Sequence, residues 1–347
     1  MSKKAWIIMM AILIVFSVCN TLSAQDKAKV VVKLATLLPK SSAGRFIELQ
    51  KAVKEQTNNE VQFKIYYGGI QGDEHDVIRK IRYRQLDGGS FTGHGLGQIV
   101  SAVRITELPY LFKNYGEVTY VRTNLEETMN QMFRKEGYVV LCWYETGFAY
   151  VFSKVPITSL EVARKQKWWM WDGDPMQKAN FDAMDIAPVS LTLTEVLTSL
   201  STRLIDAAAT TPFGAIAFRW YTRFQYMGEY PIANGIVGII VTKNAWDKIS
   251  AASQQKIMAI SNDIFSGMVQ ERRDSNAQSI TVLKKNGITI VPYDMESEDM
   301  KFIVSCSQKA REAMIGKLYS KELFDRTLAL LAEYRKNNPD STVVKIE

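Results

Sequence analysis

The 347-residue sequence has few of the residues on which most catalytic and metal sites depend. It contains only two histidines, His75 and His94, and neither has a metal-ligand neighbour at helical or hairpin spacing. We therefore expect no metal site. The sequence has no Gly-x-Ser-x-Gly elbow, and two histidines leave few bases for a serine or cysteine nucleophile. We expect neither an enzyme nor a protein with a bound cofactor.

Cysteine is also scarce. Of the three cysteines, Cys142 lies in an apolar strand-like run and Cys306 in a helical one, with no Cys-x-x-Cys spacing. An exported protein could form a disulfide, but nothing in this spacing implies one. We expect two buried free thiols.

The sequence has only one long apolar stretch, Ala5 to Val18, which follows Lys3 and Lys4. It is shorter than the roughly 20 residues of a transmembrane helix, and small or polar residues follow it. We expect a signal peptide, residues 1–24, cleaved after Ala24, and a mature protein outside the cytoplasm. Cys19 offers lipid attachment as an alternative, although Val18 before it is bulkier than such sites usually accept.

A strong charge of one sign is absent as well. The formal net charge of +7 falls to +5 without the two lysines of the expected signal peptide, and the excess is spread along the chain. Such a distribution is typical of a solvated surface, and we expect no nucleic-acid partner. The stretch GHGLG (93–97) resembles part of a phosphate loop but lacks the following Lys-Ser/Thr, so it predicts a tight turn.

Strand and helix patterns alternate along the chain. Residues 29–38 and 61–67 predict strands, each followed by a helical pattern, and 138–144 and 149–153 predict two further strands separated by a turn at Gly147. Residues 235–242 predict a buried strand, and 251–283 a helix far longer than average. The sequence therefore predicts an α/β protein with loops gathered at strand ends.

Five stretches of the sequence are distinctive. They are YYGGIQGDEHDVIRKIR (66–82), ELPYLFKNYGEV (107–118), SKVPITSLE (153–161), EVLTSLSTRLID (195–206) and VTKNAWDKIS (241–250). Together they resemble the extracytoplasmic solute-binding proteins of tripartite ATP-independent periplasmic (TRAP) transporters, and they lie in family order over nearly the whole chain after residue 24.

The resemblance implies a two-lobed periplasmic binding protein fold with a hinge and a long helix spanning both lobes. The lobes would be discontinuous, with 25–146 plus 235–275 in lobe I and 147–234 plus 276–347 in lobe II. It also implies a periplasmic location, a small-molecule ligand between the lobes and delivery to integral membrane transporter subunits. Some relatives form homodimers through the terminal helices. The amphipathic stretch 320–335 allows a homodimer here, or packing on its own lobes.

The resemblance also indicates a departure from the family. TRAP binding proteins usually hold an organic acid with an arginine of the second lobe, which pairs bidentately with a carboxylate. Alignment of SLEVARKQKWWMW (159–171) places Trp169 at that position, and a second family arginine falls at Ala149. The nearby cations considered as replacements are Arg164 and Lys167. At the other positions that line the ligand site in the family, this sequence has Leu37, Thr92, Thr210 and the apolar Leu193. Asp172 is the only candidate residue with a charge near these positions.

Aromatic residues are plentiful at the expected cleft. Trp169 is predicted to contact the ligand, whereas Trp168 and Trp171 taken singly favour core packing. The remaining candidates are the aromatics Phe91, Tyr144, Phe148 and Phe213, with Thr92, His94, Thr210 and Asp172 to orient a polar end.

Three functional hypotheses follow. The leading one is a binding protein for a hydrophobic or amphipathic ligand, such as a lipid, a terpenoid or an aromatic molecule. The first alternative is a TRAP-type protein that binds an organic acid through other cations and main-chain amides. The second alternative is an interaction or signalling module without transport.

Overall fold

The computed structural model describes residues 28–344. The predicted signal peptide, its cleavage site after Ala24 and Cys19 lie outside the described residues. Within residues 28–344, no helix is both long and apolar enough to cross a membrane.

The first lobe is built around one half of a mixed sheet, with strand order β2-β1-β3-β9-β4. The first three strands run parallel, because α2 and α3 connect them as βαβ crossovers, and β9 is antiparallel to both β3 and β4. The predicted β-α order is therefore confirmed in this part. The bounds are β1 (Val30–Thr36), α2 (Gly44–Gln56), β2 (Val61–Tyr66), α3 (Glu74–Arg82), β3 (Gly88–Thr92) and β9 (Ala233–Thr242).

The second lobe shares strand β4, which runs on to pair with two further strands. A separate two-stranded parallel sheet, β5 with β6, carries the tryptophan-rich stretch. The bounds are β4 (Tyr138–Ser153), β5 (Trp169–Trp171), β6 (Val189–Leu191), β7 (Ala207–Thr210), β8 (Tyr226–Gly228) and β10 (Thr289–Val291).

Strand β4 corrects the prediction of two strands separated by a turn. Its ladder with β9 shifts register between Glu145 and Gly147, so a bulge takes the place of the turn and the strand continues. Gly147 has a φ of 93°, and a Cβ there would clash with the Asn276 amide. Asn276 donates to the carbonyl of Thr146 (2.8 Å) and accepts from the N–H of Phe213 (3.0 Å). The bulge is therefore fastened to the helix that crosses it.

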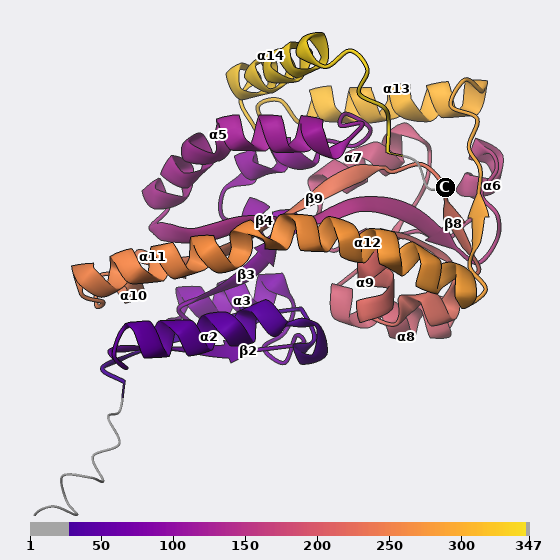
Figure 1. Ribbon diagram of the computed structural model, residues 1–347. Coiled ribbons are helices and arrows are strands. Elements are labelled where there is room, and N and C mark those ends of the chain that lie inside the picture. Colours follow the sequence, from indigo (N-terminus) through magenta and orange to yellow (C-terminus); the bar gives the residue numbers. More distant parts are fainter. Residues whose placement is uncertain (1–27, 345–347) are drawn as a thin grey trace, which may run out of the picture.

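That helix spans both lobes, as Figure 1 shows. It consists of α11 (Ala251–Ser266) and α12 (Met268–Lys285), which meet at Gly267. Helix α11 packs on α2, and α12 packs on α9 (Pro212–Ala217). The predicted long helix is confirmed, but it is bent rather than continuous.

The other helices cover the remaining faces. Helix α13 packs on α7, and α14 packs on α5 through a buried face that includes Leu323 and Leu331. The apolar face of the terminal helix is thus used within this chain, whereas the homodimer and the lobe boundaries stay predictions. The bounds are α4 (Gly93–Gly97), α5 (Tyr115–Lys135), α6 (Leu160–Arg164), α7 (Pro175–Ala183), α8 (Val196–Ser201), α10 (Lys243–Trp246), α13 (Glu298–Ala313), α14 (Lys321–Asn337) and the 3₁₀ helices η1 (Lys40–Ser42), η2 (Ser101–Glu107), η3 (Leu193–Glu195) and η4 (Trp220–Arg223).

Candidate functional site

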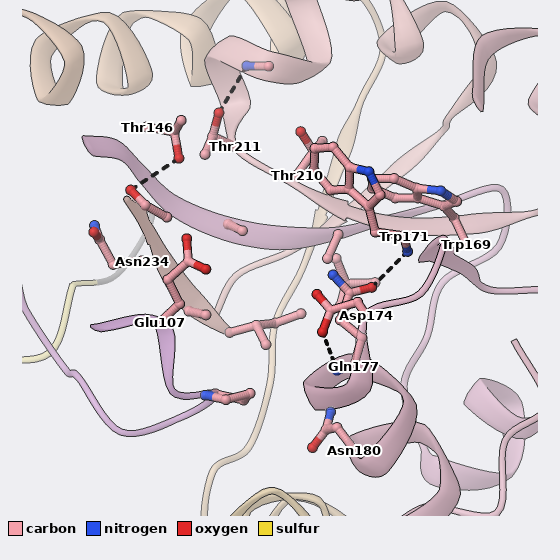
Figure 2. Close-up of a pocket in the computed structure, with 18 of the residues that line it drawn as sticks. Glu107, Thr146, Trp169, Trp171, Asp174, Gln177, Asn180, Thr210, Thr211 and Asn234 are labelled. Atoms are coloured by element: carbon pink, nitrogen blue, oxygen red, sulfur yellow. Dashed lines mark hydrogen bonds between the residues drawn. The ribbon is translucent and has the colours of Figure 1, made fainter. Parts of the chain in front are cut away.

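A cavity of about 550 Å³ lies between the lobes. Its lining comes from β3, α4 and η2 of the first lobe, from β5, α7 and α9 of the second, and from α12. Figure 2 shows part of this lining, with Glu107 and Asn234 opposite the tryptophans. The volume falls within the roughly 300–1,000 Å³ typical of small-molecule sites.

Nine of the twelve predicted site residues line this cavity. These residues come from both lobes, so chain segments more than 150 residues apart lie around one cavity. This is the arrangement that the family alignment implied. Whether each residue contacts a ligand stays a prediction. The nine are Leu37, Thr92, His94, Tyr144, Ala149, Trp169, Leu193, Thr210 and Phe213.

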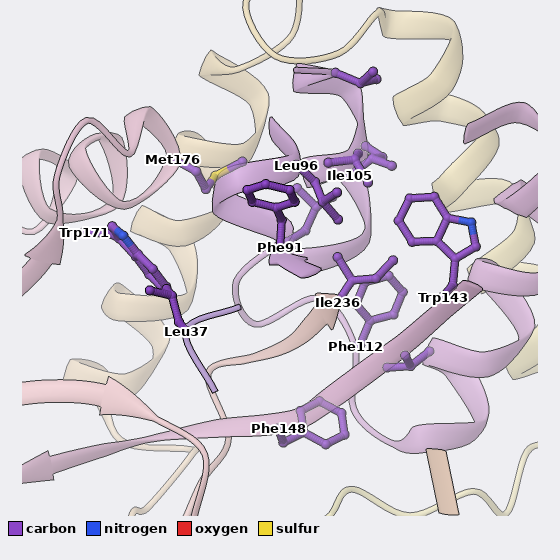
Figure 3. Close-up of a cluster of buried hydrophobic side chains, with 14 of the residues drawn as sticks. Leu37, Phe91, Leu96, Ile105, Phe112, Trp143, Phe148, Trp171, Met176 and Ile236 are labelled. Atoms are coloured by element: carbon purple, nitrogen blue, oxygen red, sulfur yellow. The ribbon is translucent and has the colours of Figure 1, made fainter. Parts of the chain in front are cut away.

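The other three predicted residues lie elsewhere. Phe91 is 1% exposed and lies among buried hydrophobic side chains beside Leu96 (Figure 3). Phe148 is equally buried and packs on Tyr115, with ring centroids 4.8 Å apart. Asp172 is exposed and accepts a hydrogen bond from Ser190 Oγ at 2.7 Å. Strand alternation and the turn after β5 direct these side chains away from the cavity.

Trp169 and Trp171 form an apolar wall in which both indole donors are used. Trp169 and Trp171 lie on one face of β5, 5.4 Å apart, and Trp220 packs edge-on against Trp169 at 5.3 Å. The indole N–H of Trp169 donates to the carbonyl of Leu191 (3.0 Å) and that of Trp171 to Asp73 Oδ2 (3.2 Å). All three rings are buried and line the cavity. The wall therefore offers contact area but no polar recognition.

A buried charge cluster lies beside this wall. Arg104 Nη1 lies 2.9 Å from Asp174 Oδ2, and Arg104 Nε lies 3.2 Å from Glu107 Oε2. His94 stacks on Trp171 at 5.0 Å, with Nδ1 3.7 Å from Asp174 Oδ2. Asp174 also caps α7 by accepting from two backbone N–H groups of its first turn. Arg104 thus already has two carboxylate partners.

The environment shifts the pKa values of two buried carboxyl groups of the lining, Asp174 and Glu74, in opposite directions. Burial alone would raise the pKa of Asp174, but Arg104 and His94 outweigh it and hold that pKa below its usual value. Burial raises the pKa of Glu74 to about 8, although Thr92 and the N–H of Gly95 donate to its oxygens. The predicted turn at GHGLG is instead the short helix α4, whose Gly93 and Gly95 lie against the carboxylates of Glu107 and Glu74.

A second guanidinium lines the cavity from α12. The Arg272 guanidinium carbon lies 3.8 Å from the centroid of the Phe213 ring, and the residue is 8% exposed. Within residues 28–344, Arg272 has no hydrogen-bond or ion-pair partner, and burial lowers its pKa. Another unused donor in the lining is Nδ2 of Asn234, a residue that is 2% exposed.

The sequence analysis did not identify these two arginines of the cavity lining. Neither cation considered in the sequence serves: Arg164 Nε donates to the carbonyl of Met184, and Lys167 Nζ to that of Arg203. A signal for Arg272 was present, because the buried positions of the long helix recur at intervals of three or four residues, and this series includes Met268, Arg272 and Asn276. The absence of an arginine at the strand position of Trp169 stays a prediction.

Comparisons with known proteins agree with the fold. A solute-binding protein from Chromohalobacter salexigens is 24% identical over 237 residues, which cover 65% of this chain and 68% of that protein. The sugar acid binding protein of Advenella mimigardefordensis, in complex with galactonate, has a TM-score of 0.81 at 15% identity and covers 89% of this chain and all of its own. A TRAP binding protein from Desulfovibrio salexigens with bound orotic acid has a TM-score of 0.77 at 16% identity, covering 88% and 99%.

The family model of the bacterial extracellular solute-binding proteins, family 7 (DctP), matches residues 40–312. This range holds all the lining residues except Thr36, Leu37 and Leu38. The match confirms the resemblance to TRAP-type binding proteins at the level of the family and supports a binding role rather than an enzymatic one. The chain belongs to the bacterial extracellular solute-binding proteins of family 7.

Proposed function

We propose that this protein captures an organic acid in the periplasm and holds its carboxylate on Arg272. It then delivers the acid to integral membrane transporter subunits. The observation that carries the proposal is the buried guanidinium of Arg272, which lines the cavity without a partner among residues 28–344.

A buried cation without a partner is costly, and a protein keeps one only where something compensates it. A ligand carboxylate provides that compensation, because its two oxygens match the edge of a guanidinium. Phe213 stacks on the guanidinium face and so leaves its N–H edge for the ligand. Arg104 is a poorer anchor, since Asp174 and Glu107 already occupy it.

The hypothesis of an organic-acid ligand, which was the first alternative in the sequence analysis, is therefore better supported than the hypothesis of a hydrophobic or amphipathic ligand without an acid group. The structural relatives named above hold galactonate and orotic acid, both organic acids. The tryptophan wall then supplies contact area for the body of the ligand, and Asn234 Nδ2 supplies a donor for a polar substituent.

Titration calorimetry with a panel of small organic acids, including galactonate and orotate, tests the proposal. We expect at least one acid to bind the wild type and to lose about 2 kcal/mol or more of binding free energy in Arg272→Met. Arg79→Met removes an exposed arginine of α3 and serves as the matched control. Equal affinities in the wild type and in Arg272→Met would show that the anchor lies elsewhere.

A further inference from the structure

The cavity does not end at the tryptophan wall. It continues to the opposite face of β5, where Trp168 points, and we call this part the distal chamber. Its lining is apolar and belongs to a hydrophobic cluster separate from the one that contains Trp169 and Trp171. The distal chamber is lined by Ile157, Ala163, Trp168, Phe181, Met184 and Ile186.

The passage between the two parts follows α7. Met176, in its first turn, belongs to the cluster of the tryptophan wall, whereas Phe181, near its end, packs on Trp168 in the distal cluster. Asn180 lines the cavity between them and accepts a hydrogen bond from Ser307 Oγ at 2.7 Å. One helix therefore borders both the charged end and the apolar end of a single cavity.

The two ends differ in unused polar groups. In the part of the cavity outside the distal chamber, Arg272 and Asn234 Nδ2 lack hydrogen-bond partners within residues 28–344. Among the six side chains that define the distal chamber, the only N–H group is Trp168 Nε1, and it already donates to the carbonyl of Ala163 (2.7 Å). The distal chamber can therefore reward only apolar surface.

The outer rim of the distal chamber is acidic. The cavity reaches Asp294 and Asp299 beside the exposed Thr158 and Pro292. Asp299 Oδ2 accepts from the N–H of Leu160 (2.9 Å), and Asp294 Oδ1 accepts from the N–H of Glu296 (2.9 Å). These acceptor-only groups repel a second carboxylate at this end of the ligand.

The cavity thus has an arginine without an ion-pair partner, an apolar distal chamber and an acidic rim around that chamber. From these three features we infer that the ligand is a monocarboxylic acid with an extended apolar body. Its carboxylate pairs with Arg272, its body lies along Trp169 and Trp171, and its far end enters the distal chamber. The inference rests on the proposed function and specifies its substrate class. Short hydroxylated acids would leave the distal chamber unfilled, and dicarboxylic acids would meet its acidic rim.

Calorimetry of the mature wild-type protein with saturated monocarboxylates of four to twelve carbons tests the inference. We expect affinity to rise about fourfold for each methylene that enters the distal chamber. Dicarboxylates of the same lengths should show no such rise. If short acids bind in an Arg272-dependent way but affinity stays flat with chain length, this inference is wrong and the proposed function stands. If no acid binds, both are wrong.

Filling the distal chamber provides an independent test. Ala163→Phe should bind the short monocarboxylates as the wild type does and abolish the gain with chain length. Ala252→Phe, at an exposed position of α11, is the matched control and should keep that gain. A gain that persists in a folded Ala163→Phe variant would place the apolar body outside the distal chamber.

Discussion

Arg104 Nη1 lies 2.9 Å from Asp174 Oδ2, and both side chains are buried. The pair joins η2 of the first lobe to α7 of the second, beside the ligand cavity. Asp73 of the first lobe makes two further connections, because its Oδ2 accepts from Trp171 Nε1 and from the N–H of Leu193, both at 3.2 Å. One ion pair and two hydrogen bonds thus connect the two lobes beside the cavity.

The substitution Asp174→Asn should destabilise the protein by about 3 kcal/mol, because it leaves the buried Arg104 with an incomplete partner. Asp172→Asn, two residues away but exposed, should change the free energy of unfolding by less than about 0.5 kcal/mol. Urea denaturation of both variants measures the difference. Equal stabilities would show that the ion pair contributes nothing.

The pH dependence of stability should follow the depressed pKa of Asp174. A carboxyl group whose pKa is lower in the folded than in the unfolded state stabilises the fold above the unfolded pKa of roughly 3.9. That stability is lost as the pH falls through the folded value. Denaturation between pH 6 and pH 2.5 should therefore show the advantage of the wild type over Asp174→Asn shrinking towards low pH. Arg104, His94 and Glu107 are the other charged or titratable groups that face the site in both proteins.

Arg272→Met should separate stability from binding. Without ligand, the variant should be at least as stable as the wild type, because methionine removes an uncompensated buried charge and keeps apolar contact with Phe213. With ligand, it should lose the stabilisation that an acid gives the wild type. Thermal unfolding with and without acid measures both quantities. A loss of more than about 2 kcal/mol in the absence of ligand would mark Arg272 as a structural residue instead.

The substitution Gly93→Ala should destabilise the protein by about 1 to 3 kcal/mol, because its Cβ would clash with the carboxylate of Glu107. That carboxylate cannot easily move, since it pairs with Arg104 and accepts from the N–H of Ile236 at 2.8 Å. Gly44→Ala, at the start of α2, meets no atom within 4 Å and should be neutral or slightly stabilising. Urea denaturation of both variants tests the comparison, and similar stabilities would contradict the crowding at Gly93.

Much of the fold was predictable because it depends on local patterns. The β-branched run at 29–38 and the alternating run at 61–67 gave strands close to β1 and β2, and the helical pattern at 251–283 gave α11 and α12. The alternation of the tryptophans also held, with Trp169 and Trp171 on one face of β5 and Trp168 on the other. Strand β4 was less predictable, because a bulge and a turn share the same glycine signal.

The site was only partly predictable. The family alignment found nine residues that line the cavity, but it missed Arg104, Glu107, Asp174, Asn234 and Arg272. The first four are polar residues in apolar or turn-like surroundings, where sequence alone favours exposure. Arg272 lies next to charged residues that suggest a solvated face, although the helical period places it inward.

By itself, the sequence determined the order of strands and helices and the family, because hydrophobic period and motif text are properties of neighbouring residues. Only the tertiary structure decided which charges share the cavity. Arg104 and Asp174 are 70 residues apart, and Arg272 and Phe213 are 59 apart, so their pairing depends on how β4, α7 and α12 cross in space. Charge compensation in a buried site depends on the distance between the charges in space and on their burial. The number of residues between two positions in the sequence determines neither.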